Sequence, residues 1–175
     1  ALIADEERKM PCILIIDDDQ QVRRLLRQCL EPDGHHVIEA ADGAKGLEQF
    51  AAHAVDLFVI DLILPEYSGW DTINELQKRS PGTPFIVISG GAPLEGLKRG
   101  SGPTLESLRR VAPFQVLRKP LEWGAINAAV DALLARLDRA SAATAGNRTY
   151  LVTVVDYRWS LRRPWVPSQR VRMVS

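Results

Sequence analysis

Five short apolar runs alternate with longer amphipathic segments along the first 140 residues. The runs cover residues 12–16, 36–40, 56–60, 85–88 and 114–117. The first, third and fourth are apolar almost throughout, which predicts strands buried on both faces of a sheet, and the second is the weakest. Apolar strands that alternate with amphipathic helices predict an α/β domain, in which helices cover a five-stranded parallel sheet on both faces and the crossovers are right-handed.

The segments between the runs carry helical spacing. In residues 20–30, apolar side chains recur at offsets 0, 3, 4, 7 and 8 from Val22, which is one stripe of an amphipathic helix. Asp19 is the expected N-cap of this helix, because its side chain can accept a hydrogen bond from the first turn. Further helices are predicted at residues 44–52, 70–78, 104–111 and 123–139.

The two ends of the chain lie outside this alternation. Residues 1–9 precede the first strand and are interpreted as an N-terminal extension. Residues 10–140 are predicted to form one domain, because 175 residues are too few for two ordinary domains. Residues 141–175 are predicted to be a linker and a basic tail, either disordered, packed on the domain or non-native, with a strand-like pattern at residues 150–155.

The amino-acid composition is that of an ordinary soluble globular protein. Apolar residues make up 46% and charged residues 25% of the chain, and the formal net charge is zero, so composition names no partner. The tail carries six arginines against one aspartate, which leaves an acidic body of net charge −5. Cys12 and Cys29 lie in apolar patterns without metal-ligand spacing and are interpreted as reduced core residues. No run is long enough to span a membrane, and a cytoplasmic location is expected.

Polar or charged residues close four of the predicted strands. Asp17 and Asp18 follow the first strand, Asp61 the third, Ser89 the fourth and Lys119 the fifth. In open parallel sheets these carboxyl ends form the ligand-binding edge. Neighbouring carboxylates repel one another, and a hard divalent cation with oxygen ligands, most naturally Mg²⁺, relieves that repulsion. Together with a hydroxyl and an ammonium, this set predicts phosphoryl transfer with an Asp carboxylate as nucleophile.

Four stretches at these strand ends resemble, in order, the response-regulator receiver domain of two-component signalling. They read ILIIDDD at 13–19, DLILPEYSG at 61–69, VISGG at 87–91 and LRKP at 117–120. The resemblance extends from about Met10 to Arg139. It implies the flavodoxin-like strand order 2-1-3-4-5.

The resemblance also implies roles for the acidic residues. Asp61 is expected to be the phosphoacceptor. Asp18 is expected to hold Mg²⁺ directly and Asp17 largely through water, with Asp61 and the backbone carbonyl of Ile63 as further ligands. These assignments follow from the family pattern and not from the spacing of the residues.

For the remaining strand ends, the resemblance implies that Ser89 bonds the phosphoryl group and that Lys119 supplies a cation. The Lys119–Pro120 peptide is expected to be cis, as is generally the case in the family.

Two features depart from the family pattern. Val116 stands where receivers often have a switching Tyr or Phe, and the segment between Ser89 and Lys119 is longer than usual, with the extra length in residues 90–102.

The function implied is acceptance of a phosphoryl group from a histidine kinase or phosphotransfer protein, in a signalling domain that is not an enzyme beyond self-dephosphorylation. Residues 141–175 are too few for a helix-turn-helix module, so no DNA-binding domain is expected. The sequence therefore favours a stand-alone receiver that contacts no membrane and acts through an unknown downstream protein.

Two alternatives remain open. The stretch IIDDDQQV resembles the DxDx(T/V) signature of haloacid dehalogenase-like phosphatases, with Asp17 as nucleophile and Asp19 as acid/base. Gln21 replaces the expected Thr, and this alternative leaves the stretch at Asp61 unexplained. The second alternative is a receiver-like interaction module that no longer switches, which Val116 and the long segment favour.

Overall fold

Each of the five apolar runs forms a strand. The computed structural model describes residues 10–65, 68–90, 112–142 and 153–154. The strands are β1 Cys12–Ile16, β2 His36–Ala40, β3 Leu57–Asp61, β4 Phe85–Ser89 and β5 Phe114–Arg118. They lie in the order β2-β1-β3-β4-β5, and every neighbouring pair is parallel. The predicted fold class and strand order are confirmed.

A short strand extends the sheet at its β5 edge. Thr153–Val154, labelled β6, pairs parallel with Gln115 and Val116 of β5. Part of the strand-like pattern in the tail therefore joins the sheet. The remainder of residues 143–175 lies outside the described residues, as do residues 1–9.

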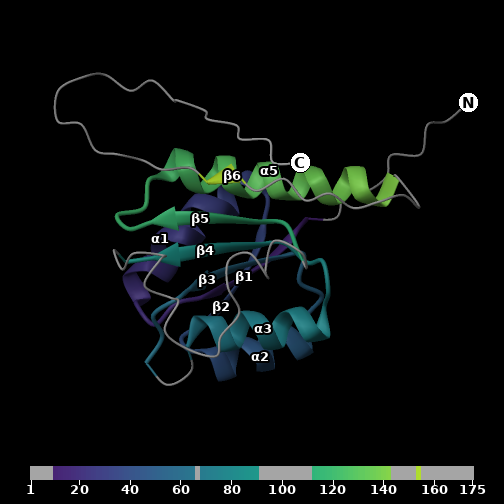
Figure 1. The fold of residues 1–175 in the computed structure, drawn as a ribbon. Helices are drawn as coiled ribbons and strands as arrows, with labels where there is room; N and C mark the ends of the chain where they lie inside the picture. Colours follow the sequence, from purple (N-terminus) through teal and green to yellow (C-terminus); the bar gives the residue numbers. More distant parts are fainter. Residues whose placement is uncertain (1–9, 66–67, 91–111, 143–152, 155–175) are drawn as a thin grey trace, which may run out of the picture.

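Helices cover both faces of the sheet (Figure 1). They are α1 Gln20–Leu30, α2 Gly43–Ala52, α3 Gly69–Arg79 and α5 Trp123–Ala142, with a 3₁₀ turn at Glu31–Asp33. Helices α1 and α5 lie on one face, and α2 and α3 lie on the other. The predicted helix at residues 104–111, and nearly all of the segment before it, lie outside the described residues.

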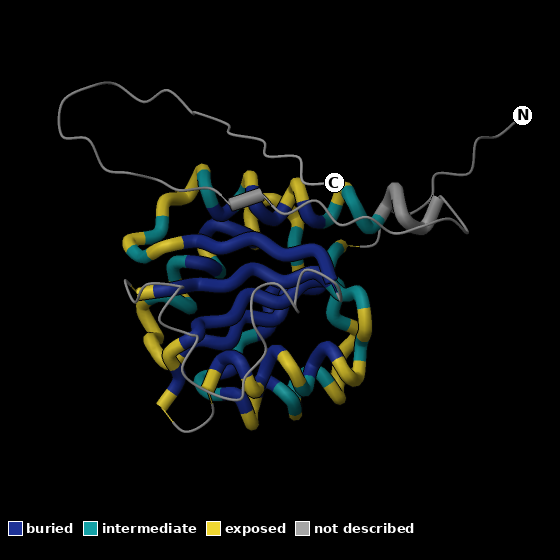
Figure 2. Tube along the Cα trace, viewed as in Figure 1, coloured by how far each residue is buried: buried dark blue, intermediate teal, exposed yellow. Residues whose placement is uncertain are grey.

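The sheet residues alternate between two apolar clusters. Leu14 and Ile16 belong to the cluster on the α2–α3 face, while Ile13 and Ile15 belong to the cluster that includes α1 and α5 residues. Figure 2 shows most of the strand residues as a buried layer between the helices, with β1, β3 and β4 buried along their whole length. Because both faces are covered, these strands are apolar at successive positions, as the sequence predicts. Both cysteines are buried and neither is in a disulfide, as expected.

The loop after β3 is held close to α3. A Cβ built on Gly69 would lie 2.1 Å from the Asp61 carbonyl oxygen and 2.6 Å from Leu62 Cα. The Gly69 amide donates to the Leu62 carbonyl oxygen at 3.2 Å, and Ser68 caps the helix by accepting from the Asp71 amide. Only glycine allows this approach, so Gly69 sets how the chain leaves the end of β3.

Helices long and apolar enough to cross a bilayer are absent from the described ranges.

Candidate functional site

Asp61 ends β3 and is almost entirely buried, with 3% of its surface exposed. Its Oδ2 accepts a hydrogen bond from Lys119 Nζ at 2.5 Å. Its Oδ1 accepts from the backbone amide of Ile63 at 2.8 Å. A buried carboxylate requires such partners, and these two fix the orientation of the Asp61 side chain.

Asp17 is the first residue after β1 and is fully buried. Its Oδ1 accepts from the Asp19 amide at 2.9 Å. Its Oδ2 lies 3.2 Å from Lys119 Nζ, close enough for an ion pair, but it makes no hydrogen bond. Burial raises the pKa of Asp17 to about 6, although the Asp19 amide and the charge of Lys119 favour the ionised form.

Lys119 joins the two buried carboxylates. Its side chain is 26% exposed and reaches both Asp61 and Asp17. Burial lowers the pKa of Lys119, but the hydrogen bond to Asp61 and the charges of Asp17 and Asp61 outweigh burial and raise the pKa above its ordinary value. Lys119 therefore stays charged at neutral pH.

Backbone contacts bring Lys119 beside Ser89. The Lys119 amide donates to the Ser89 carbonyl oxygen at 3.0 Å, and the Lys119–Pro120 peptide is cis, as expected. Ser89 ends β4 and is 3% exposed. Within the described parts of the chain, no hydrogen bond joins its hydroxyl to Asp17, Asp18 or Asp61.

Three predicted metal ligands gather at this edge. Carboxylate oxygens of Asp17, Asp18 and Asp61 lie within 4.8 Å of one another, and Asp18 is the exposed member. The buried Asp17 Oδ2 pairs with the Lys119 ammonium at 3.2 Å but accepts no hydrogen bond among the described residues, so it keeps lone pairs that a metal ion could use. Hard oxygen donors without sulfur or imidazole fit Mg²⁺ better than a transition metal. The fourth predicted ligand, the Ile63 carbonyl, belongs to a residue with an exposed side chain.

Asp19 and Val116, which the sequence analysis singled out, do not belong to the carboxylate cluster. Asp19 is the N-cap of α1, because its Oδ1 accepts from the Gln21 amide at 2.7 Å. This contact confirms the predicted cap and gives Asp19 a structural role at the start of α1. Val116 lies in β5 opposite Val87 and is 3% exposed, so its side chain is part of the core.

Sequence reasoning missed Arg23, the fourth residue of α1. Arg23 Nη1 donates to the backbone oxygens of Asp17 at 2.7 Å and Asp18 at 3.1 Å. Its Nε donates to Glu39 Oε2 at 3.3 Å. The only signal in the sequence was an arginine one turn after the acidic residues, which a solvent-exposed helix position would explain equally well.

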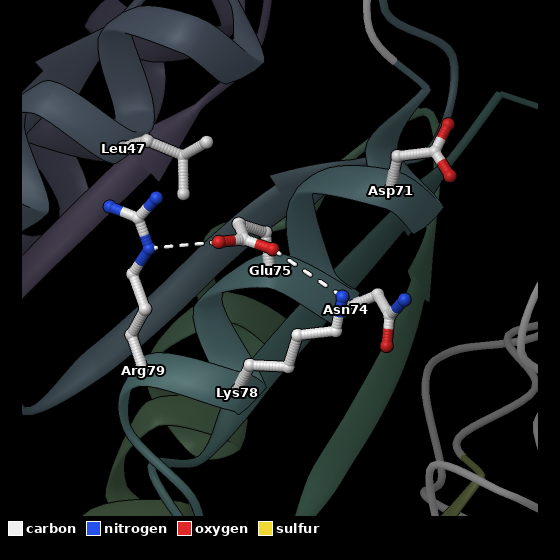
Figure 3. Close-up of a pocket in the computed structure, with 6 residues that line it drawn as sticks. All are labelled: Leu47, Asp71, Asn74, Glu75, Lys78 and Arg79. Atoms are coloured by element: carbon white, nitrogen blue, oxygen red, sulfur yellow. Dashed lines mark hydrogen bonds and ion pairs between the residues drawn. The ribbon is translucent and has the colours of Figure 1, made fainter.

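A separate pocket of about 470 Å³ lies between α2 and α3 (Figure 3). It is lined by Leu47 and by Asp71, Asn74, Glu75, Lys78 and Arg79. Glu75 pairs with Arg79 at 3.1 Å and with Lys78 at 3.5 Å within the same helix. None of the strand-end residues lines this pocket, and exposed pairs along one helix contribute little energy. The chemistry therefore belongs to the carboxylate edge.

A parallel sheet in which β1 to β5 lie in the order 2-1-3-4-5, with an acidic cluster and a lysine at its carboxyl edge, is the architecture that the sequence resemblance implies. The model of the family described as "Response regulator receiver domain" matches residues 13–102, which is about half of the chain. The chain belongs to the response regulator receiver domain family. The sequence resemblance is thereby confirmed.

Two of the relatives that the chain resembles are named as transcriptional regulators. The chain is 32% identical over 119 residues to the transcriptional regulatory protein GlrR of Escherichia coli, covering 68% of this chain and 25% of GlrR. It is 33% identical over 133 residues to the probable transcriptional regulator ycf27 of Porphyridium aerugineum, covering 74% of this chain and 50% of ycf27. The chain thus spans a quarter to a half of the length of these relatives.

Solved receiver structures share the fold. A response regulator receiver domain protein of the CheY-like type from Methanospirillum hungatei covers 75% of this chain and 98% of its own, with a TM-score of 0.65 and 26% identity. A receiver domain protein from Clostridium thermocellum covers 75% and 99%, with a TM-score of 0.64 and 25% identity. The likeness extends over the whole of each solved domain.

The expectation that no DNA-binding domain accompanies this receiver is wrong. GlrR and the KDP operon transcriptional regulatory protein KdpE, which is 41% identical over 80 residues, are transcriptional regulatory proteins that extend far beyond the matched part. A receiver folds as its own module, so the shortness of residues 141–175 carries no information about the output of the protein. The stand-alone interpretation rested on the same count and loses its support.

Proposed function

We propose that this chain, with residues 10–140 as the receiver, accepts a phosphoryl group on Asp61 from the phosphohistidine of a histidine kinase or phosphotransfer protein. The observation that carries the proposal is the position of Asp61. It is a buried carboxylate at a strand end, paired with Lys119 at 2.5 Å, within 4.8 Å of two further carboxylates. A carboxylate placed in this way is a nucleophile with cationic support.

In the proposed step, an oxygen of Asp61 attacks the phosphorus, and the phosphorus–nitrogen bond to the histidine breaks. The imidazole leaves with the bonding electron pair and takes a proton from water, and Asp61 becomes an acyl phosphate. Lys119 and the Ser89 hydroxyl would contact phosphoryl oxygens. Mg²⁺ bound by Asp17, Asp18, Asp61 and the Ile63 carbonyl would supply positive charge against the phosphoryl group.

Phosphorylation would then shift an existing equilibrium between two arrangements of the receiver surface near β4 and β5. Val116 is a small side chain inside the core, so the readout in this chain would not use an aromatic side chain at that position. The same observation favours the second candidate, an interaction module that keeps the fold without switching.

Phosphorylation by a small acyl phosphate, followed by intact-mass measurement, tests the proposal. We expect one phosphoryl group per chain in the presence of Mg²⁺, and none without Mg²⁺ or in Asp61→Asn. Absence of labelling in the wild type would favour the non-switching module. Steady turnover of a small phosphoester without a phosphorylated chain would favour a phosphatase.

Two variants separate the roles at the site. Asp18→Ala should abolish most of the affinity for Mg²⁺, and an unchanged metal titration would contradict its role as a ligand. Lys119→Ala should still take up some phosphoryl group but lose the conformational response. An unchanged response, followed by NMR shifts of β4 and β5 amides, would contradict the role of Lys119.

A further inference from the structure

The connection from β1 to α1 is held by a guanidinium. Arg23 Nη1 donates to the carbonyl oxygens of both Asp17 and Asp18, at 2.7 Å and 3.1 Å. These carbonyls lie beyond the end of β1, where the strand ladder no longer supplies partners. Backbone oxygens in a partly buried connection need donors, and one planar guanidinium can serve both.

Arg23 is itself held in place. Its side chain is only 13% exposed, and its Nε donates to Glu39 Oε2 of β2 at 3.3 Å. The other oxygen of Glu39 accepts from Arg27 Nε at 2.5 Å. An ion pair with a carboxylate of the neighbouring strand restricts the rotamers of Arg23, so the donor stays aimed at the two carbonyls.

Of the two aspartates, Asp18 depends more on the contact between Arg23 and the backbone. The Asp17 side chain is fixed by the Asp19 amide and by Lys119. The exposed Asp18 carboxylate has no such partner among the described residues. Its direction therefore depends on its own backbone, whose carbonyl Arg23 holds.

We propose that Arg23 is a positioning residue for cation binding, which fixes the Asp17–Asp18 backbone so that the two carboxylates face a divalent cation without rearrangement. The inference rests on the proposed function, because it requires that the acidic edge binds Mg²⁺. Arg23 acts on the backbone of the ligands and does not touch the cation. Partners of this kind contribute on the order of tenfold to a hundredfold in metal affinity.

The sign of the effect distinguishes positioning from simple electrostatics. Removing a positive charge near three carboxylates would, by Coulomb attraction alone, strengthen the binding of a cation. Loss of positioning weakens it. Arg27 is the matched control, because it is an arginine of the same helix that pairs with the same Glu39, and no hydrogen bond joins it to the Asp17 or Asp18 backbone in the described part of the chain.

The experiment is isothermal titration of the unphosphorylated protein with Mg²⁺, for wild type, Arg23→Ala, Arg23→Lys and Arg27→Ala, each shown to be folded by circular dichroism. We expect Arg23→Ala to bind Mg²⁺ about tenfold more weakly than Arg27→Ala. Arg23→Lys should recover only part of the loss, because an ammonium lacks the fork that serves two carbonyls and a carboxylate. Amide hydrogen exchange without metal gives a second readout, and exchange at Asp19 should accelerate only in the two Arg23 variants.

The outcomes are separable. Equal affinities in Arg23→Ala and Arg27→Ala, or tighter binding in Arg23→Ala, would overturn the positioning role and leave the proposed function intact. A wild type that binds no Mg²⁺ contradicts the cation site of the proposed function, and the positioning role with it.

Discussion

The burial of Asp17 makes a quantitative prediction about stability and pH. Asp17 is fully buried, and its pKa rises from an ordinary value of 3.8 to about 6 because burial disfavours the charged form. Between these two values the folded chain keeps a proton on Asp17 that the unfolded chain has released. The folded state then binds more protons, so folding stability falls as the pH rises through this window and stays low above it.

The magnitude follows from the same values. Because a tenfold change in an equilibrium constant corresponds to about 1.4 kcal/mol, a pKa of about 6 instead of 3.8 corresponds to a loss of about 3 kcal/mol at neutral pH. Asp17→Asn keeps the shape of the side chain and removes the titration. Without metal, we therefore expect the unfolding free energy of Asp17→Asn, relative to that of wild type, to rise by about 3 kcal/mol between about pH 3 and about pH 8.

Urea denaturation with a chelator, at a series of pH values, measures this difference in unfolding free energy. Asp18→Asn is the matched control, because Asp18 is the exposed member of the cluster and its replacement relieves no burial. Saturating Mg²⁺ should stabilise the wild type and reduce the advantage of Asp17→Asn, because a ligand that binds only the folded state adds to stability. A difference between wild type and Asp17→Asn that does not change with pH would refute the reasoning.

Three further predictions follow from single contacts at the same edge. Lys119→Ala leaves Asp17 and Asp61 buried without their cation. Thermal denaturation without metal should therefore show that the unfolding free energy falls by about 3 to 5 kcal/mol near neutral pH. An unchanged melting temperature would contradict the pairing. Gly69→Ala forces a Cβ against the Asp61 backbone and should lower the unfolding free energy, measured by urea denaturation, by about 1 to 3 kcal/mol. Gly124→Ala is the control, because a Cβ there has open space around it and should cost nothing. Equal effects of the two substitutions would argue against the close approach. Asp19→Ala removes a helix cap and should cost about 1 kcal/mol of unfolding free energy while phosphorylation of Asp61 persists, and loss of phosphorylation in a folded variant would return Asp19 to the chemistry.

The hydrophobic pattern located the strands to within a residue or two. The largest local difference concerns Asp56, which the pattern placed in the third strand, whereas β3 is Leu57–Asp61. The Asp56 carboxylate accepts from the Cys12 amide at 2.8 Å, and the Asp56 amide donates to the Cys12 carbonyl oxygen. Asp56 thus caps the start of β1 by a contact 44 residues away in the sequence, which no local pattern records.

The sequence by itself determined the sheet, its order through the family pattern, and the convergence of Asp17, Asp18, Asp61, Ser89 and Lys119. It could do so because parallel strands place their carboxyl ends at one edge, so residue type at four strand ends defines a site without any distances. Only the tertiary structure decided that Lys119 lies between Asp61 and Asp17, that Gly69 packs on the Asp61 carbonyl, and that Arg23 holds the acidic connection. These contacts join residues from different strands and helices. Their geometry depends on how the elements pack, which periodicity along the chain does not encode.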